Sequence, residues 1–498
     1  MSAKANEAAA PFTVAYAGRH FIGGEWTESM GTPIEVVSPS REEVVATVAG
    51  ASEADVNRAV AAAREAFDNG PWPRLSPAER ADAIDRLADA LERRASELAW
   101  VATLQMGAPL TMATGVTAGA IAIYRNFARL ARTYPFEDVR PRASGGVGIV
   151  VGEPVGVVAA ITPWNGPALL CAIKVGPALA AGCTIVLKPA PETPLDAYIL
   201  AECAEEAGIP PGVINLVVAG REVADALVRH PDVDKISFTG STAVGKHILE
   251  VAAPRIARVS LELGGKSAAV VLDDADMATT IASLMHEVTR NTGQVCAALT
   301  RIIVPRARRQ DYAEALAEAV KTIRVGDPFD SATQVGPLAM KRQLERVQSY
   351  VQRGQADGAT LVTGGGTPQG LDRGYYFEPT VFTDVDNSMV IAREEIFGPV
   401  ASIIGHNGSE DAIRIANDTP FGLHGAVYTQ DPEQAYAVAR RLRTGNVGHN
   451  LKVIDFALPF GGFKQSGLGR EGGIEGLRQF LEVKTVYMDA APTNLTNG

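Results

Sequence analysis

The alternation of strand-like and helical segments between residues 147 and 262 most constrains what this chain can fold into. After a stretch rich in Val, Ile and Gly at 148–165, helical patterns at 168–181, 194–207 and 222–229 alternate with short apolar runs at 183–189, 213–218 and 235–240. Helical crossovers join parallel strands, which read as continuous apolar runs because helices cover both faces of the sheet. The pattern therefore predicts an α/β fold, and open sheets of this kind bind ligands at the carboxyl ends of their strands.

Two helices are predicted ahead of this region from their capping residues. Ser52 with Asp55 has the spacing of a capping box, and Ser76 is followed by proline at the first helical position and by Glu79 at the third. Apolar residues then recur at helical spacing, at positions 84, 87, 88, 91, 95 and 98. We therefore expect one helix with a single buried face to run from Ser76 to residue 98. Residues 21–26 (FIGGEW) predict an early turn.

A second strand–helix unit begins near residue 258. Segment 258–272 leads into further strand or turn pieces at 362–366, 378–385, 401–406 and 424–429, with helical stretches between them. A last strand-like piece, 484–489, lies outside both units. An isolated strand leaves its backbone groups unpaired, so we expect it to need a partner edge, for which another subunit is one candidate.

Length and charge narrow the class of protein. A chain of 498 residues exceeds what one core usually serves, so two or more domains are expected. The net charge of −11 argues against a surface for nucleic acid or for an anionic membrane. No segment approaches the roughly 18 apolar residues of a membrane span. Residues 1–16 have neither the apolar core of a signal peptide nor the Arg-rich character of a transit peptide, so we expect a short disordered tail and a cytoplasmic protein.

Cysteine and histidine usage predicts neither a disulfide scaffold nor a metal centre. The four cysteines are scattered without a CxxC pair, and the seven histidines fall in no HxxxH or HExxH spacing. Free thiols in a chain of this length fit a reducing compartment.

Two glycine-rich segments have residue types suited to ligand or acid–base chemistry. In 238–245 (FTGSTAVG), Gly240 permits a sharp turn and Ser241 stands where a helix N-terminus would present free N–H groups to a phosphate. A purely structural turn between a strand and a helix is the alternative. In 261–268 (LELGGKSA), Glu262 is a single carboxylate in an apolar run. A solvated surface glutamate is one interpretation, and a buried general base with a raised pKa is the other.

Two more segments offer a nucleophile and an oxyanion donor. Cys296 lies between small or apolar neighbours in 291–301 (NTGQVCAALTR), where it is either core filler or a thiol activated by nearby groups. Asn165 lies in 162–167 (TPWNGP), where it is either a turn former or an amide that stabilises an oxyanion.

Together these motifs resemble those of the aldehyde dehydrogenase superfamily, from FIGGEW to KTV at 484–486. LELGGKSA and GQVCA are similar to the glutamate and cysteine signatures of that family, and PWN, LKP, FTGST, EEIFGPV and PFGGFKQSGLGRE follow in the family's order. The resemblance implies an aldehyde dehydrogenase-like α/β fold with a Rossmann-variant cofactor-binding domain (10–131 and 154–264), an α/β catalytic domain (265–466) and a small β oligomerisation arm (132–153 and 480–494). A homodimer or homotetramer would follow from that arm.

The resemblance also implies a reaction, the oxidation of an aldehyde to the carboxylic acid with reduction of NAD(P). Cys296 would form a thiohemiacetal and then a thioester, with the oxyanion held by the Asn165 side chain and by the backbone N–H of Cys296. Glu262 would activate the hydrolytic water, and Lys174 and Glu471 match positions linked to a proton relay toward that base. No metal is implied.

By the same resemblance, Lys188 would bind the adenosine ribose, Ser241 the pyrophosphate and Glu395 the nicotinamide ribose, while Trp164 and Phe397 wall the cleft. The full set of expected cofactor contacts is Ile161, Thr162, Pro163, Trp164, Lys188, Gly240, Ser241, Gly245, Leu263, Glu395 and Phe397. The expected substrate contacts are Gly166, Leu170, Ile173, Val295, Ala297, Ile454 and Phe460.

Two departures from the family pattern bear on specificity. The third residue after the ribose lysine is often glutamate in NAD-preferring members. Here that residue is Pro191, and Glu192 follows one position later. We favour NAD as the coenzyme, with NADP as the alternative. Gly166 replaces an aromatic residue that often follows the oxyanion asparagine. We therefore expect a wide apolar tunnel for a medium-to-large apolar aldehyde, with no Arg or Lys placed for a substrate carboxylate. Phe456 or Phe460 refilling the gap is the alternative.

Two rival functions remain at this point. The first is a CoA-acylating semialdehyde dehydrogenase, which Glu262 disfavours because that reaction needs no hydrolytic water. The second is a non-catalytic structural or binding protein on the same scaffold, which the presence of Cys296, Glu262 and Asn165 disfavours.

Overall fold

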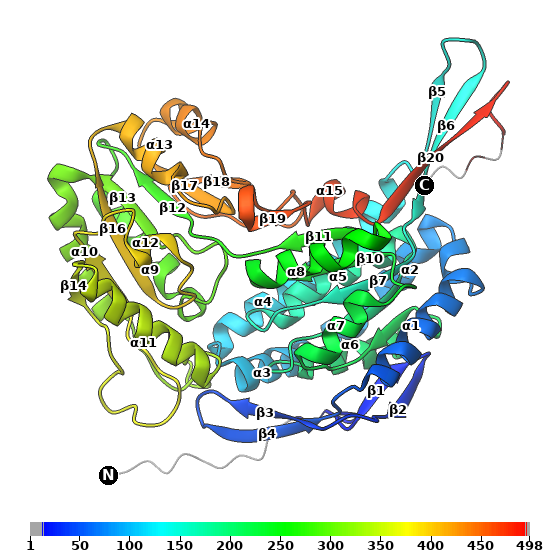
Figure 1. The fold of residues 1–498 in the computed structure, drawn as a ribbon, viewed down its shortest axis with the longest axis horizontal. Coiled ribbons are helices and arrows are strands. Elements are labelled where there is room, and N and C mark those ends of the chain that lie inside the picture. Colours follow the sequence, from blue (N-terminus) through cyan, green and yellow to red (C-terminus); the bar gives the residue numbers. More distant parts are fainter. Residues whose placement is uncertain (1–11, 13, 494, 496–498) are drawn as a thin grey trace.

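The computed structural model describes residues 12, 14–493 and 495. Most of the tail expected at 1–16 therefore lies outside the described residues, as do the first residues of the predicted cofactor-binding domain and residue 494 of the predicted arm. The chain forms an eight-stranded sheet, a seven-stranded sheet, a three-stranded sheet and a two-stranded sheet. Figure 1 shows the two large sheets side by side, with the three-stranded sheet projecting away from them at the upper right.

The first large sheet contains the predicted parallel strands. Its order is β19-β11-β10-β7-β8-β9-β1-β2. The strands are β1 (Arg19–Ile22), β2 (Glu25–Glu28), β7 (Val157–Ile161), β8 (Thr184–Lys188), β9 (Ile214–Leu216), β10 (Lys235–Thr239), β11 (Arg258–Glu262) and β19 (Gly467–Leu468). Strands β7 to β11 pair in parallel, which confirms the prediction, and β1 and β19 add antiparallel edges.

Helices cover both faces of this sheet, because successive side chains of its strands point to opposite sides. Val158 and Ala160 of β7 pack with one helical layer, and Val157 and Ala159 pack with the other. The first layer contains α2 (Pro77–Arg93), α3 (Ala95–Met106), α4 (Leu110–Thr133), α5 (Pro167–Ala181) and α6 (Leu195–Glu206). The second contains α1 (Glu53–Asp68), α7 (Arg221–Arg229) and α8 (Thr242–Ala252). Short 3-10 turns lie at η1 (Trp72–Arg74) and η2 (Ala253–Arg255).

Both predicted capping boxes are present, but the second helix is shorter than expected. Ser52 and Ser76 each accept the backbone N–H three residues ahead, and the carboxylates of Asp55 and Glu79 bond back to the cap. Helix α2 ends at Arg93, and Arg94 adopts non-helical angles of φ −104° and ψ 16°. The prediction of one helix running to residue 98 was therefore wrong: residues 95 and 98 belong to α3. The apolar spacing continues across the break because both helices pack on the same core.

The FIGGEW segment forms the predicted turn, between β1 and β2. Gly23 and Gly24 both have positive φ, of 64° and 86°. Glycine adopts this left-handed conformation without the steric cost that a Cβ adds, which suits the two-residue hairpin connection.

The second large sheet has the order β14-β15-β16-β13-β12-β17-β18. Its strands are β12 (Ala268–Val271), β13 (Arg301–Pro305), β14 (Thr360–Thr363), β15 (Thr380–Thr383), β16 (Val400–His406), β17 (His424–Tyr428) and β18 (Asn446–His449). All neighbouring pairs are parallel except β14 with β15.

Two helical layers enclose this sheet as well. One contains α9 (Met277–Thr289) and α10 (Arg309–Lys321), and the other contains α11 (Lys341–Ala356), α12 (Val390–Arg393), α13 (Ser409–Asn417) and α14 (Pro432–Ala439). The remaining short elements are η3 (Arg290–Gly293), η4 (Arg306–Arg308), η5 (Lys464–Ser466) and α15 (Gly473–Arg478). The predicted domain boundary after residue 264 falls between β11 and β12, which belong to different sheets.

The last strand finds its partner within the chain. Strand β20 (Leu481–Met488) pairs antiparallel with β6 (Val147–Pro154), which in turn pairs with β5 (Glu137–Pro141). Our expectation that this strand would need a partner edge is therefore confirmed, and for one edge the partner is β6 of the same chain rather than another subunit. The sheet order β20-β6-β5 leaves the other edge of β20 unpaired among the described residues. A separate hairpin joins β3 (Ile34–Ser38) and β4 (Glu43–Val48).

None of the helices in the described part of the chain is both long enough and apolar enough to cross a lipid bilayer.

Candidate active site

A cavity of about 860 Å³ opens at the carboxyl ends of the first sheet's strands, beneath α7 and α8. The chain leaves β7 for β8 and β9 on one side and returns to β10 and β11 on the other. The cavity therefore lies where the strand order reverses, the usual ligand site in open α/β sheets. Its lining residues are Ile161, Lys188, Arg221, Glu222, Ala224, Asp225, Val228, Phe238, Ser241, Ala243, Val244, His247 and Ile248.

Three expected cofactor contacts line this cavity, namely Ile161, Lys188 and Ser241. Lys188 is buried at the end of β8, and its Nζ donates to the carbonyl of Ala219 at 3.4 Å. Burial lowers the pKa of Lys188 to about 8, and the nearby carboxylate of Glu192 partly opposes that shift. The cavity thus presents a buried amine that can hydrogen-bond a polar ligand.

The FTGSTAVG segment connects β10 to α8 as predicted. Ser241 caps the helix, its Oγ accepting the N–H of Val244 at 3.4 Å. A Cβ on Gly245 would lie 2.6 Å from the Leu263 side chain, so this glycine lets α8 pack closely on the sheet. Leu263 therefore packs on α8 from below, and it is not among the residues that line the cavity.

The loop that carries Cys296 follows α9 and η3 and has an unusual backbone. Asn291, Thr292 and Gly293 all have positive φ, of 50°, 55° and 72°. A Cβ on Gly293 would lie 2.2 Å from the backbone of Gly398, which excludes a larger residue. Buried hydrogen bonds hold this shape, because Thr292 Oγ1 donates to the carbonyl of Gly336 at 3.0 Å. Strained backbone of this kind is commonly found at functional sites.

Asn165 lies in the loop between β7 and α5 and contacts the cysteine loop directly. Its Nδ2 donates to the carbonyl of Gln294 at 2.9 Å, and its own carbonyl accepts from Asn291 Nδ2 at 2.8 Å. A side-chain amide has two N–H donors, so a second one is available beside Cys296. Among the described residues, no hydrogen-bond acceptor takes the backbone N–H of Cys296. The Asn165 amide and the backbone N–H of Cys296 can therefore both donate a hydrogen bond to an oxyanion that forms here.

Cys296 is half-buried, whereas Cys171, Cys183 and Cys203 are fully buried. Burial raises the pKa of the Cys296 thiol to about 12, and the carboxylates of Glu395 and Glu262 raise it further. Lys452 and the backbone N–H of Ala297 act in the opposite direction. The thiol is therefore protonated at rest, and carboxylates that could accept its proton face it from two segments of the chain.

Glu262 ends β11 and is 4% exposed, so the surface interpretation is excluded. Its Oε2 has no hydrogen-bond partner among the described residues. Burial raises the pKa of Glu262 well above its usual range, with a further contribution from Glu471. A buried carboxylate with a raised pKa and an open oxygen has the properties of a general base.

Lys174 and Glu471 form a buried ion pair behind this base. Lys174 Nζ lies 2.5 Å from Glu471 Oε1, and their side chains are 0% and 6% exposed. The backbone of Glu471 exchanges hydrogen bonds with that of Phe460, at 2.6 Å and 2.7 Å. Both residues affect the pKa of Glu262, Glu471 raising it and Lys174 lowering it. The structure thus places the expected relay residues next to the expected base.

Two glycines after Glu262 stand where other segments approach too closely for a side chain. A Cβ on Gly264 would lie 2.6 Å from Glu395 Oε2, and one on Gly265 would lie 2.4 Å from the carbonyl oxygen of Cys296. The N–H of Gly265 donates to Glu395 Oε1 at 3.1 Å. Burial raises the pKa of Glu395 to about 7. The missing side chains bring the glutamate, the cysteine loop and β11 together.

Trp164 and Phe397 meet edge to face, with ring centroids 5.2 Å apart and planes at 84°. Trp164 is the third residue after the end of β7, following Thr162 and Pro163. Phe397 has a positive φ of 63°. Thr162 is buried and accepts a hydrogen bond from the Cys171 thiol, with an Sγ–Oγ1 distance of 3.6 Å. The two rings form an apolar wall beside the cysteine loop.

An apolar group, which we call the thiol cluster, surrounds Cys296. It consists of Ala297, Leu423 and Phe460, with Val295, Ile454, Phe456 and Cys296 packed against them. Four of the expected substrate contacts are therefore brought together at the thiol. Phe456 and Phe460 meet edge to face at 5.5 Å.

Gly166, Leu170 and Ile173 approach from the start of α5. A Cβ on Gly166 would lie 3.6 Å from Leu170 Cδ1, an ordinary van der Waals contact. The neighbour of this position is thus Leu170 rather than Phe456 or Phe460. Ile173 is 1% exposed and lies within the packed interior.

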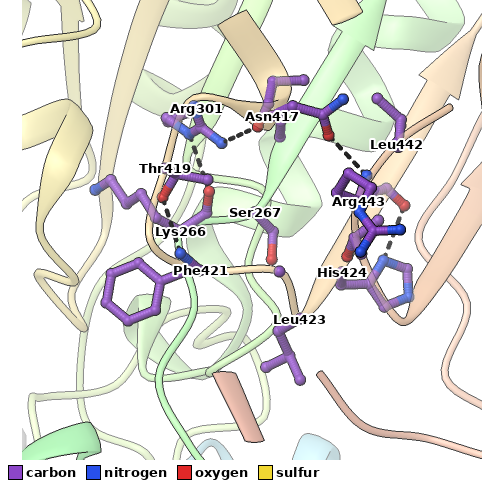
Figure 2. Close-up of a pocket in the computed structure, with 15 residues that line it drawn as sticks. Lys266, Ser267, Arg301, Asn417, Thr419, Phe421, Leu423, His424, Leu442 and Arg443 are labelled. Atoms are coloured by element: carbon purple, nitrogen blue, oxygen red, sulfur yellow. Dashed lines mark hydrogen bonds between the residues drawn. The ribbon is translucent and has the colours of Figure 1, made fainter. Parts of the chain in front are cut away.

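A second, small cavity of about 20 Å³ lies between Lys266 and the 416–425 segment. Figure 2 shows Arg301 here, held among backbone carbonyls. Its guanidinium donates to the carbonyls of Lys266 at 2.9 Å, Ile415 at 2.9 Å and Ala416 at 2.8 Å. This space has room for about one water molecule. The hydrogen bonds of Arg301 join β13 to α13, so these contacts have a structural role.

The structure adds polar residues that the sequence did not reveal. The cavity wall includes residues of α7 and α8, and Lys452, which is buried in a pair with Glu287, lowers the pKa of Cys296. The expectation that no Arg or Lys is placed for a substrate carboxylate stays a prediction, because Lys452 is already paired with Glu287. The position of Lys452 two residues before Ile454 was the available signal. Among the described residues, no group of three or more His, Cys, Asp or Glu side chains is arranged to hold a metal ion.

Comparisons with known proteins agree with this geometry. The family model described as "Aldehyde dehydrogenase family" matches residues 26–486. A geranial dehydrogenase of Castellaniella defragrans is 46% identical over 470 residues, covering 94% of this chain and 98% of that protein. A 3-succinoylsemialdehyde-pyridine dehydrogenase of a Pseudomonas species is 45% identical over 471 residues, with coverage of 94% and 97%.

Among solved structures, a mutant of Pseudomonas syringae aldehyde dehydrogenase C in complex with NAD⁺ and octanal superposes with a TM-score of 0.93 at 44% identity, covering 96% of this chain and 98% of that one. A Mycobacterium tuberculosis aldehyde dehydrogenase in complex with NAD⁺ gives 0.92 at 45% identity, with coverage of 95% and 98%. The matched residues span both large sheets, the cysteine loop and the Glu262 strand, and the chain belongs to the aldehyde dehydrogenase family.

Proposed function

We propose that this protein oxidises a medium-to-large apolar aldehyde to the carboxylic acid, with NAD⁺ as the preferred coenzyme. The observation that carries the proposal is the arrangement around Cys296. The thiol lies in an apolar cluster, two N–H donors adjoin it, and the buried carboxylates of Glu262 and Glu395 act on it.

The coenzyme would occupy the 860 Å³ cavity and reach toward the cysteine loop. The cavity fits such a group, because it lies at a strand-order reversal, contains the buried Lys188 amine and adjoins the N-terminus of α8. When bound, the nicotinamide supplies the acceptor for the hydride of the aldehyde. Lys188 would bind ribose hydroxyls, and Glu395 would orient the nicotinamide end.

The residues of the chain account for the remaining steps. The Cys296 thiol would pass its proton to one of the neighbouring carboxylates, and its Sγ would bond to the aldehyde carbon. The Asn165 Nδ2–H and the Cys296 N–H would stabilise the resulting oxyanion of the thiohemiacetal. Loss of the hydride leaves a thioester. Glu262 would take a proton from the attacking water, and the acid leaves as Cys296 regains its thiol proton. Lys174 and Glu471 would carry the proton away from the buried base.

NAD⁺ is favoured over NADP⁺ by the position of Glu192. This carboxylate acts on Lys188, so it lies near the expected ribose site, and it also forms an ion pair with Arg342 at 2.5 Å. A negative charge there repels a 2′-phosphate. Steady-state assays with both coenzymes test this preference.

Two finer proposals concern assembly and location. The unpaired edge of β20 and its exposed Val483 and Tyr487 side chains support a homodimer or homotetramer formed through the arm. The four free thiols support a cytoplasmic location.

The experiment that tests the function is Cys296→Ala, assayed by the absorbance of reduced coenzyme over a series of aldehydes. A folded variant should have no measurable dehydrogenase activity, because no other side chain near the site can form the thioester. Oxidation at the wild-type rate would overturn the mechanism. Adding coenzyme A to wild-type protein distinguishes the acylating alternative, since only that reaction would require it.

A further inference from the structure

A buried ion pair beside the thiol cluster has no part in the mechanism above. Lys452 Nζ contacts Glu287 Oε2, and the side chains are 1% and 4% exposed. Burying two charges is costly even when they are paired, and apolar residues of the same volume often stabilise a fold equally well. Stability alone therefore gives no reason for a charged pair at this position.

Lys452 belongs to the row of side chains that walls the thiol cluster. Along the segment after β18, Leu451 and Val453 are exposed, whereas Lys452 is buried and Ile454 and Phe456 are half-buried. Alternate side chains of an extended segment point to the same side. Since Ile454 and Phe456 pack in the thiol cluster, Lys452 extends the same inward-facing row.

Glu287 belongs to a different element of the chain. It lies in the last turn of α9, whose chain continues through η3 into the cysteine loop. The ion pair therefore ties the wall of the cluster to the helix that leads to Cys296. His424 connects the same segment to β17, because its Nε2 lies 2.9 Å from the carbonyl oxygen of Val453.

The positive charge of Lys452 favours the ionised form of the Cys296 thiol, because it lowers the pKa of that thiol. Charged or titratable groups around Lys452 are Glu287, Arg290, His286, His424 and Cys296. Burial lowers the pKa of both histidines below the usual value, so neither adds positive charge near neutral pH. The carboxylates of Glu262 and Glu395 act in the opposite sense and disfavour the ionised form of the thiol.

We propose that Lys452 is a positioning residue for the nucleophile: its ammonium, held in the wall of the thiol cluster by Glu287, stabilises the Cys296 thiolate against the two facing carboxylates. The inference rests on the proposed role of Cys296 as nucleophile. The thiolate is the reactive form of cysteine, and in a water-poor site a nearby positive charge favours it strongly. Glu287 keeps the ammonium in place, since an unpaired buried lysine would tend to lose its proton.

The test measures thiol reactivity rather than turnover. The double variant Lys452→Met/Glu287→Gln removes both charges without leaving a buried carboxylate unpaired. The rate of Cys296 alkylation by iodoacetamide, followed by peptide mass spectrometry on the coenzyme-free enzyme, should show its pH midpoint raised by roughly half to one unit. At a fixed pH below the midpoint, this corresponds to about three- to tenfold slower alkylation.

Two further variants separate charge from packing. Lys452→Arg keeps the positive charge, so the pH profile of its alkylation rate should match that of the wild type. Arg94→Met/Glu202→Gln removes the partly buried ion pairs of Arg94 with Glu202 and Glu97, which connect α2 and α3 to α6, and should leave the profile unchanged. Melting curves verify that each variant is folded.

The proposal also predicts how turnover changes. The kcat/KM of the double variant should fall by the same factor for short and long aldehydes, because the thiolate serves every substrate. An unchanged alkylation profile in a folded double variant would overturn the proposal, as would a loss of activity confined to some aldehydes. Retained turnover in Cys296→Ala would instead count against the nucleophile itself, so the two failures are distinguishable.

Discussion

At the scale of single residues, the site consists of buried ionisable groups that shift one another's pKa values. Glu262 and Glu395 are both buried, and burial raises the pKa of each. These carboxylates in turn raise the pKa of Cys296. A thiol between two potential proton acceptors can release its proton when a reaction needs the thiolate. The same arrangement keeps the thiol neutral and protected from oxidation at rest.

The first prediction concerns Glu262→Gln. The variant should retain a burst of reduced coenzyme but lose roughly 10²- to 10⁴-fold in steady-state turnover, because water activation follows hydride transfer. Since burial raises the pKa of Glu262, the base is protonated below that raised value. Wild-type deacylation should therefore slow as pH falls through it, and the variant should lack this limb of the pH profile. Stopped-flow absorbance measures both, and unchanged steady-state turnover would refute the assignment.

A second prediction concerns substrate size at Gly166. Each methylene buried against the thiol cluster contributes about 0.8 kcal/mol, so kcat/KM should rise with the apolar length of the aldehyde until the space is full. Gly166→Phe should penalise large aldehydes far more than acetaldehyde, because the ring competes with Leu170 and with the substrate. Gly166→Ala is the matched control, since its Cβ fits at 3.6 Å from Leu170. Equal kcat/KM for all sizes in all three proteins would exclude the wide-tunnel hypothesis.

At the scale of elements, capping chemistry fixes where helices begin, and packing decides where they end. Ser52 and Ser76 form capping boxes as their sequences predict. Arg94 ends α2 without a glycine or proline, and it forms ion pairs with Glu97 and Glu202. These contacts join α2 and α3 to α6. The break is therefore stabilised by long-range partners that a local pattern does not reveal.

The corresponding prediction is that Ser76→Ala lowers stability by about 1 kcal/mol, because it removes the acceptor for the N–H of Glu79. Ser76→Gly is the control and should cost only a few tenths of that, since an unhindered cap remains open to water. Urea unfolding followed by circular dichroism measures the difference. Equal midpoints for Ser76→Ala and the wild type would show that the cap contributes nothing.

At the scale of the whole molecule, the two large sheets meet so that the cavity lined by α7 and α8 and the cysteine loop belong to different units. Figure 1 shows the β5–β6–β20 arm extending away from both. Val483 and Tyr487 of β20 are 68% and 71% exposed, and the strand has an open edge. Exposed apolar residues on an unpaired strand favour pairing with another chain.

Accordingly, we predict that Val483→Asp/Tyr487→Asp lowers the oligomeric mass measured by sedimentation velocity. Charges on the open edge would disfavour strand pairing between copies. Ile256→Asp is the control, because Ile256 is equally exposed, at 76%, but lies outside the arm. An unchanged mass in the arm variant would place the interface elsewhere.

The sequence by itself determined the alternation of strands and helices, the capped helix starts, the glycine turn at Gly23 and Gly24, and the motif order that indicated the family. These are local signals, since they depend on residues within a few positions of one another or on recognisable sequence motifs. The roles assigned to Cys296, Glu262, Asn165 and the cofactor contacts remain predictions. The structure brings Asn165 and Glu262 to the cysteine loop, and three of the expected cofactor contacts line one cavity.

Only the tertiary structure decided which distant residues act on one another. The end of α2, the pairing of β20 with β6, and the approach of Lys452 and Glu287 to Cys296 each depend on contacts between segments far apart in the chain. Gly264 and Gly265 are required because the Glu395 side chain and the backbone of the cysteine loop fill the space where their side chains would stand. Burial, and with it the raised pKa of Glu262, exists only once these segments have packed, because desolvation is a property of the assembled interior.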